Sequence, residues 1–127
     1  MNYRLPKSER LHSEKLIKEL FNEGSSFFLY PFKIQYLIQN PAGEETLQVL
    51  FSVSKKKNKK AVVRNLIKRR MREAYRLNKH LLSGLDQGVL IGLIYVASGP
   101  LSYQEIEAKI KQSLSKIQEL IPGKIEE

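Results

Sequence analysis

The sequence contains no cysteine, so disulfide bonds and metal sites built from thiolates are both excluded. The start of the chain lacks the apolar stretch of a signal peptide. The longest apolar run, Val89 to Ala97, is about half as long as a membrane span. These absences predict a cytoplasmic protein that does not enter a membrane. A hydrophobic content of 42% predicts one folded domain with a modest core.

Acidic residues are missing from one segment, 55–72, in which ten of the eighteen residues are basic. The other twelve Lys and Arg nearly balance the thirteen Asp and Glu of the chain, so the formal net charge of +9 belongs to this segment. A local excess of this kind attracts polyanions, of which nucleic acid is the commonest. The ten basic residues are Lys55, Lys56, Lys57, Lys59, Lys60, Arg64, Lys68, Arg69, Arg70 and Arg72.

The side chains that an enzyme needs for catalysis are also scarce. His12 and His80 stand alone, and each is interpreted as a surface or packing residue. No Glu-x-x-His, His-x-x-x-His or Asp-x-Asp spacing offers a metal site, and no Gly-rich phosphate loop opens a helix. The sequence therefore predicts a protein that binds, with no catalytic residue, metal or cofactor of its own.

Periodicity in the first half predicts one helix followed by two strands. Ser13–Glu23 has an apolar helical face with Ser13 as N-cap, and Gly24 stands where a left-handed residue often ends a helix. Apolar and polar residues alternate in Ser26–Gln39 and again in Thr46–Ser54. A turn signal separates the two segments, so we expect them to pair as a hairpin.

The second half predicts a helix, a buried strand and a final helix. A basic loop, 55–60, leads into a helix over 61–80, and Val89–Ala97 is typical of a strand buried on both faces. Ser102 and Glu105 have the spacing of a capping box for the last helix. The predicted order is α-β-β-α-β-α, an α+β fold of a single two-layer domain over residues 1–127.

The helix over 61–80 is amphipathic, with a basic ridge opposite its apolar stripe. Arg70 departs from this pattern because it lies near the middle of the stripe, where it could extend past the core edge or face a polar cleft. The predicted apolar stripe is Val63, Leu66, Ile67, Met71, Ala74, Leu77 and Leu81. The predicted ridge is Arg64, Asn65, Lys68, Arg69, Arg72, Arg76 and Lys79.

Three features could bind RNA, and each has a plainer alternative. The loop lysines could bind phosphates or simply keep the surface soluble. The ridge arginines could form bidentate phosphate contacts or a solvated helix face. A cluster of aromatic residues could stack on single-stranded bases, although most of its members are expected in the core. These aromatic residues are Phe21, Phe27, Phe28, Tyr30, Phe32 and Tyr36.

Two stretches, Ser52–Lys56 and Ala61–Arg76, closely resemble the signature of the bacterial ribonuclease P protein subunit. That pattern is a Ser-Val-Ser-Lys-Lys strand end, a short loop, and then Ala-Val-x-Arg-Asn-Arg-x-Lys-Arg-x-x-Arg-Glu. The resemblance extends over nearly the whole chain. It departs at Leu66, where the pattern has its second Arg, and in the loop after Lys56, which is longer here and has no Gly.

The resemblance implies a function in tRNA maturation. Ribonuclease P removes the 5′ leader of precursor tRNA, and its RNA subunit catalyses with magnesium, so the protein alone is expected to be inactive. One protein per ribonuclease P RNA is expected, with the single-stranded leader held in a cleft between the first helix and the sheet. The implied sheet is mostly antiparallel, with one parallel pair joined by a left-handed βαβ crossover from Thr46–Ser54 to Val89–Ala97.

The resemblance and the basic ridge together imply the contacts to the catalytic RNA, and the resemblance alone implies the residues of the leader cleft. The expected contacts to the catalytic RNA are Lys55, Lys56, Lys59, Lys60, Arg64, Asn65, Lys68, Arg69, Arg70, Arg72 and Arg76. The expected leader cleft contains Arg10, Ile17, Phe21, Phe32, Gln35 and Tyr36. Ile17 and Gln35 stand where aromatic residues are common in the family, so stacking on the leader is expected to be weaker or to use Tyr36 instead.

Two other functions remain open from the sequence. A ribosomal or other structural RNA-binding protein would share the basic loop, and a protein-only nuclease would cleave precursor tRNA without RNA. The missing acid–base and metal constellation argues against the nuclease.

Overall fold

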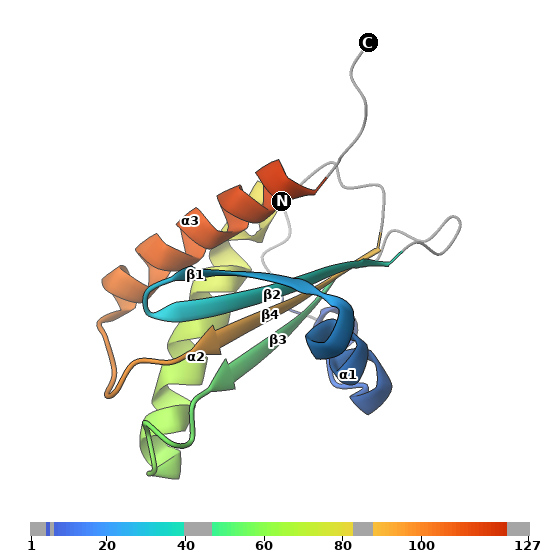
Figure 1. Ribbon diagram of the computed structural model, residues 1–127. Helices are drawn as coiled ribbons and strands as arrows, with labels where there is room; N and C mark the ends of the chain where they lie inside the picture. Colours follow the sequence, from blue (N-terminus) through green and yellow to red (C-terminus); the bar gives the residue numbers. More distant parts are fainter. Residues whose placement is uncertain (1–4, 6, 40–46, 83–87, 122–127) are drawn as a thin grey trace.

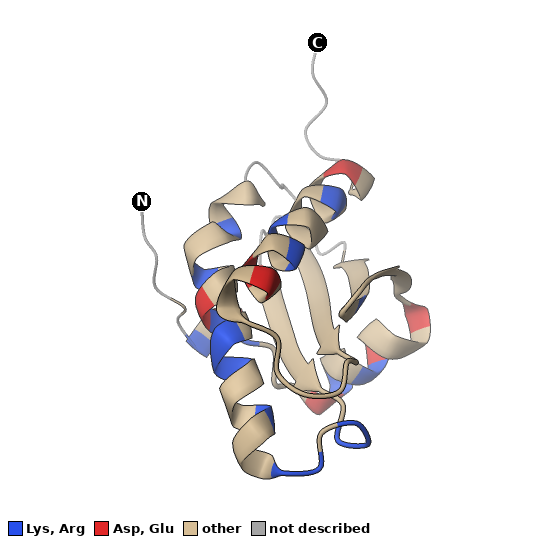
Figure 2. Cartoon of the chain, turned by 90° about the vertical axis from the view of Figure 1, so that its left-hand side faces the viewer, with Lys and Arg blue, Asp and Glu red and all other residues tan. Residues whose placement is uncertain are grey.

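The computed structural model describes residues 5, 7–39, 47–82 and 88–121, which form a four-stranded sheet with helices on both faces (Figure 1). The long helices α2 and α3 cover one face of the sheet, and the short helix α1 lies on the other (Figure 2). The elements in chain order are the 3-10 turn Lys7–Glu9, α1 Glu14–Glu23, β1 Ser25–Leu29, β2 Phe32–Gln39, β3 Leu47–Val53, α2 Ala61–Asn78, the 3-10 turn Lys79–Leu81, β4 Gly88–Tyr95 and α3 Tyr103–Leu120. No helix in these ranges is long and apolar enough to cross a membrane.

The predicted strand Ser26–Gln39 is in fact two antiparallel strands, β1 and β2. The chain reverses at Tyr30 and Pro31, whose peptide bond is cis, and Leu29 pairs with Phe32. Proline has no backbone N–H to donate and fixes its own φ, so an uninterrupted strand through this position was not favourable. The periodicity identified the strand residues correctly, and the expectation missed the turn between them.

The predicted hairpin between β2 and β3 is wrong. The strand order is β1-β2-β4-β3, and β4 pairs antiparallel with β2 and parallel with β3. β4 lies in the middle of the sheet, where both its faces and both its edges are covered. This position explains why almost all of its residues are buried. Alternation in β2 and β3 indicates which residues share a face, but it does not indicate which strand lies alongside.

The connection from β3 through α2 to β4 is a left-handed crossover. In Figure 1 both strands point to the left, β4 lies above β3, and Figure 2 shows that α2 lies behind the sheet in that view. Crossovers of this kind are right-handed in the great majority of proteins. The expected α+β class, parallel pair and left-handed crossover are therefore confirmed.

Side-chain caps begin α1 and α3 as predicted, and the expected conformation at the end of α1 is corrected. The Ser13 side chain accepts a hydrogen bond from the Leu16 N–H, and Ser102 with Glu105 forms the expected capping box. Gly24 is extended, with φ −78°, so the left-handed conformation expected there is wrong. A Cβ at Gly24 would lie 2.4 Å from the Leu20 carbonyl oxygen of α1 and 2.7 Å from the Tyr36 carbonyl oxygen of β2, so the close approach of the helix end to the sheet requires the glycine.

The sheet separates two apolar clusters. The larger cluster lies under α2 and α3 and includes Ile67 and Met71 from α2. The smaller one joins α1 to the opposite face through Leu20 and Leu90. In the predicted stripe of α2, Ile67, Met71 and Ala74 are buried, whereas Val63, Leu66, Leu77 and Leu81 are half-buried. Tyr75, which the stripe did not include, is fully buried and packs edge-on against Phe51.

Candidate nucleic-acid interface

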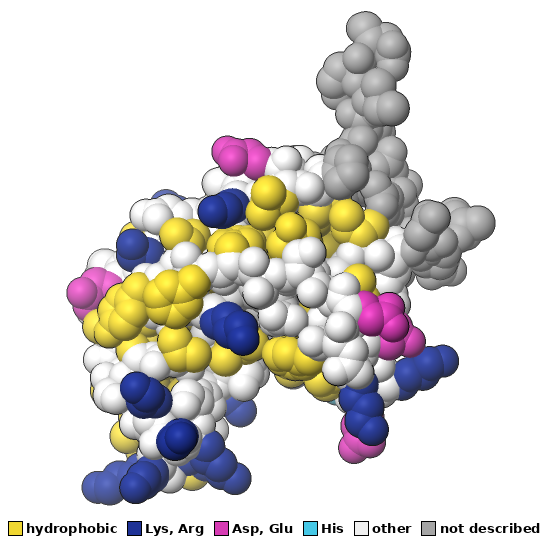
Figure 3. Space-filling view, in the orientation of Figure 1, with side chains coloured by type: hydrophobic (Ala, Val, Ile, Leu, Met, Phe, Trp, Pro, Cys, Tyr) yellow, Lys and Arg dark blue, Asp and Glu magenta, His cyan; other side chains and the backbone are white. Residues whose placement is uncertain are grey.

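A compact basic loop, residues 55–60, leaves the end of β3 and enters α2. Its five lysines are exposed, whereas Asn58 is only 4% exposed. Figure 3 shows Lys and Arg side chains gathered at the lower left of the molecule, where Figure 1 places this loop. The loop therefore presents a cluster of like charges to solvent, as the sequence predicted.

The outward face of α2 continues this positive surface. Asn65, Arg69 and Arg72 are exposed, and together with Val62 and Leu66 they line a shallow hollow. Within the described part of the chain, neither guanidinium makes a hydrogen bond or an ion pair, so both are available to a partner. Val62 is 80% exposed. Leu66 is half-buried, because it lies at the boundary between the apolar stripe and the basic face of α2.

Two other arginines of the predicted set donate hydrogen bonds to the protein's own backbone. Nη1 of Arg64 donates to the carbonyl oxygens of Asn58 and Lys59, at 2.9 and 2.8 Å. Nη1 of Arg70 donates to the carbonyl of Leu101, in the turn before α3. Arg70 therefore extends past the core edge, one of the two placements that the sequence allowed, and it points toward α3.

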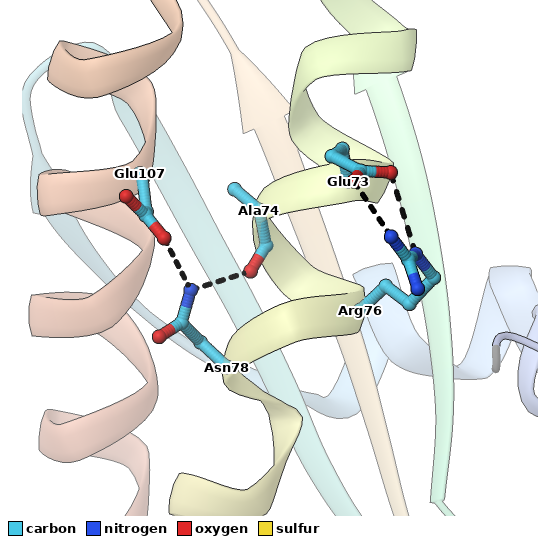
Figure 4. A network of polar contacts seen from close by, with 5 residues as sticks. All are labelled: Glu73, Ala74, Arg76, Asn78 and Glu107. Carbon is cyan, nitrogen blue, oxygen red and sulfur yellow. Dashed lines mark hydrogen bonds and ion pairs between the residues drawn. The ribbon is translucent and has the colours of Figure 1, made fainter. Parts of the chain in front are cut away.

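Arg76 and Asn78 belong to the C-terminal half of α2 (Figure 4). Arg76 forms an ion pair with Glu73 at 2.6 Å, and this hydrogen bond raises the pKa of Arg76 above its ordinary value. The buried amide Nδ2 of Asn78 donates to the Ala74 carbonyl and to the Glu107 carboxylate of α3. This end of the helix is therefore partly neutralised, and it is tied to its neighbour.

A second candidate surface lies on the side of the sheet that carries α1. Phe21 of α1 is 44% exposed and Ile17 is half-buried, while Phe28 of β1 is 58% exposed. The exposed Lys33 of β2 pairs in register with Phe28, so the two side chains share this face. Aromatic rings beside a cation on an open sheet are suited to single-stranded RNA. Sequence reasoning omitted Phe28 from the cleft, although alternation from Lys33 across the turn could have identified it.

Three of the residues expected in the leader cleft are placed elsewhere. Phe32 is fully buried on the α2 side of the sheet, where it packs edge-on against Tyr95 at 5.7 Å between ring centroids. Tyr36 lies on that same side, half-buried against Phe27. Gln35 faces α1 but is 6% exposed, and its Nε2 donates to the Leu20 carbonyl. Because neighbouring residues of a strand face opposite sides, Gln35 and Tyr36 could not both line one cleft.

Arg10 lies at the outer edge of β3, in register with Val49, which faces the α2 side of the sheet. It is exposed, and its backbone forms an isolated parallel bridge with Val49 of β3, just before α1. Of the expected cleft, the structure thus brings Ile17 and Phe21 to one side of the sheet together with Phe28 and Lys33. In the described ranges, no three His, Asp or Glu side chains gather where they could hold a metal ion.

A family model and curated relatives match this chain over most of its length. The model described as Ribonuclease P matches residues 5–118. A "Ribonuclease P protein component" from Porphyromonas gingivalis is 36% identical over 123 residues, which cover 94% of this chain and 90% of the relative. A protein of the same name from Bacillus velezensis is 33% identical over 112 residues, which cover 88% of this chain and 91% of the relative.

Solved structures with the same fold include two proteins described as RNase P proteins. The one from Staphylococcus aureus has a TM-score of 0.65 and 23% identity, covering 87% of this chain and 95% of its own. The one from Thermotoga maritima has a TM-score of 0.66 and 24% identity, covering 85% of this chain and 96% of its own. At these identities the likeness concerns the fold.

Proposed function

Because this chain belongs to the ribonuclease P protein family, we propose that its basic loop and the outward face of α2 bind the ribonuclease P RNA. The observation that carries the proposal is the concentration of the net charge of +9 in this one exposed loop and helix face. Exposed Lys and Arg side chains neutralise phosphates and release counterions, which favours binding to folded RNA. Guanidiniums such as those of Arg69 and Arg72 can also bind phosphate through two parallel hydrogen bonds.

In this proposal the RNA carries the catalytic centre and the protein acts by binding. Magnesium would be required by the RNA, where it would stabilise the charge that develops on the reacting phosphate. The protein would lower the electrostatic repulsion between the RNA subunit and its RNA substrate, one protein being bound per RNA. The expected location is the cytoplasm, where transcription supplies precursor tRNA.

We assign the substrate's 5′ leader to the α1-side surface. Phe21 and Phe28 offer exposed ring faces for unpaired bases, and Lys33 offers a cation for the leader phosphates. We keep the exposed Arg10, at the edge of β3, as a second cation that a longer leader would reach. A single-stranded leader suits this surface because its bases are free to leave the stack. Contacts of this kind depend little on sequence, as one protein that binds the leaders of many precursors would need.

Reconstitution is the experiment that tests the proposed function. Purified protein, freed of RNA by nuclease treatment and repurified, is combined with ribonuclease P RNA transcribed from the same genome, and removal of the 5′ leader is measured at low magnesium. The pair should cleave, whereas the protein alone should not. Cleavage by the RNA-free protein would establish a protein-only nuclease instead. Exclusive association with ribosomal RNA in cells would favour a structural RNA-binding protein.

A further inference from the structure

Asn58 is the one residue of the basic loop whose side chain is buried. Its amide Nδ2 donates to the Ala97 carbonyl at 2.8 Å, and its Oδ1 accepts from the Gly99 N–H at 2.7 Å. Its backbone N–H donates to the Ser54 carbonyl. The side chain therefore links the segment that follows β3 to the segment that follows β4.

The turn that receives Asn58 is itself held by two other elements. The Tyr95 hydroxyl donates to the Gly99 carbonyl at 2.7 Å and accepts from the Leu101 N–H at 3.0 Å. Arg70 of α2 donates to the Leu101 carbonyl. The hydrogen bonds of Asn58 thus attach the basic loop to a turn that β4 and α2 hold in place.

Arg64 closes the same loop from the helix side. Its Nη1 donates to the carbonyls of Asn58 and Lys59, and its backbone N–H donates to the Lys60 carbonyl as the helix begins. The guanidinium also places one positive charge next to loop carbonyls instead of pointing freely into solvent. Arg64 and Asn58 together fix the loop between the sheet and α2.

We propose that Asn58 is a positioning residue for RNA binding, which with Arg64 holds the lysine loop preformed beside the basic face of α2. The proposal rests on the proposed RNA-binding function and extends it to a residue that carries no charge. Five lysines in a free six-residue loop would repel one another and spread apart. Holding the loop in one shape before binding removes part of the ordering cost that RNA binding would otherwise have to offset.

The chemistry of this position requires both a donor and an acceptor. The amide of Asn58 satisfies the Ala97 carbonyl and the Gly99 N–H at once, which a carboxylate cannot do because an ionised Asp has no donor. An alanine would leave both backbone groups without this partner. Neither Asn58→Ala nor Arg64→Lys changes the net charge, so each separates loop position from total charge.

The test measures the affinity of Asn58→Ala for ribonuclease P RNA by filter binding across a range of salt concentrations. We expect an affinity about tenfold lower than that of the unmodified protein, with an unchanged salt slope, because the same lysines still reach phosphates once bound. Hydrogen exchange of the Gly99 N–H should become faster, and trypsin should cleave faster after the loop lysines. Gln104→Ala, which removes an exposed amide from α3, serves as the matched control and should change none of these three readouts.

Arg64→Lys keeps the charge but cannot bridge two carbonyls in the same way, so it supplies a second variant if Asn58→Ala fails to fold. An open loop, shown by faster exchange, with unchanged RNA affinity would overturn the proposal. A shallower salt slope would also overturn it, because phosphate contacts would then have been lost. Failure of the unmodified protein to bind the RNA would refute the proposed function itself, which distinguishes the two outcomes.

Discussion

Basic side chains of this protein divide into those bonded within the fold and those open to a partner. Arg64 and Arg70 donate to backbone carbonyls, and Arg76 pairs with Glu73. Arg69 and Arg72 stay exposed around the hollow on α2. A substitution in the first group is expected to change structure as well as charge, whereas one in the second group should change binding alone.

Leu66 stands where the family pattern has an arginine, within the positive surface of α2. Leu66→Arg should raise affinity for ribonuclease P RNA about threefold to tenfold, because one more guanidinium reaches the phosphates. The salt slope should steepen by about 0.7–0.9, as expected for one added phosphate contact. Leu66→Met is the control, since it retains an apolar side chain and should leave the slope unchanged. An unchanged slope for Leu66→Arg would place this hollow outside the RNA contact.

Phe21 is the most direct probe of the α1-side surface. Phe21→Ala should weaken binding of precursor tRNA to the holoenzyme by about tenfold, because stacking on one base contributes about 1–3 kcal/mol. Binding of mature tRNA, which has no leader, should not change. Leu120→Ala on α3 is a matched control because Leu120 is also 44% exposed. An equal loss for precursor and mature tRNA would contradict the assignment of this surface to the leader.

At the scale of elements, α2 has two separate tasks along its length. Its first turns carry the exposed cations and close the basic loop, while its last turns attach to α3. Asn78 makes that attachment by donating to Glu107 and to the helix's own Ala74 carbonyl. A polar contact to α3 at the far end of the helix thus adds to the apolar packing that holds α2 against the sheet.

Asn78→Asp should lower the free energy of unfolding by about 2–3 kcal/mol at neutral pH, because a buried carboxylate would face Glu107 without a donor. Repulsion should raise the pKa of the introduced carboxyl above its unfolded value, so the loss should be smallest below about pH 4 and should grow as pH rises. Urea unfolding followed by circular dichroism measures the change. Asn65→Asp on the exposed face of the same helix is the control. Equal stability of the two variants would exclude a structural role for the Asn78 contact.

At the scale of the whole molecule, the sheet separates the two candidate RNA surfaces. The basic face of α2 lies on one side and α1 with Phe21 and Phe28 on the other, and the basic loop lies between them at the end of β3 (Figure 2). This arrangement would allow one small domain to contact a large folded RNA and a single-stranded leader at the same time. The lysines of the loop are placed where both partners could approach.

Salt dependence measures how much of this surface acts electrostatically. If about six to eight phosphates are neutralised, the logarithm of affinity for ribonuclease P RNA should fall against the logarithm of salt with a slope of about −4 to −7. Removing Arg69 and Arg72 together should reduce the magnitude of that slope by about 1.4–1.8. Replacing Lys111 and Lys116 on α3 removes the same charge from another element and should alter the slope less. A flat salt response would refute electrostatic binding to RNA.

Local periodicity and charge were sufficient for most of the secondary structure and for the exposed basic segment. The capping box of Ser102 and Glu105, the N-cap Ser13 and the exposed lysine loop are all as predicted, because each depends on residues close together in the sequence. The motif from Ala61 to Arg76 likewise indicated the family, which the comparisons confirm. Each of these properties is determined by side chains that are close together in the sequence.

Strand partners and the roles of individual side chains depended on tertiary structure. Alternation placed Phe32 and Gln35 in a strand, but burial of Phe32 against Tyr95 and of Gln35 under α1 followed from which helix covers which face. The place of β4 in the middle of the sheet and the capture of Asn58 by the turn after β4 join segments far apart in the chain. The sequence by itself thus determined that this protein carries a concentrated positive charge on a helix and loop. Only the folded chain decided which cations remain free, because the path of the basic loop brings its carbonyls to Arg64, and packing of distant segments brings the Leu101 carbonyl to Arg70.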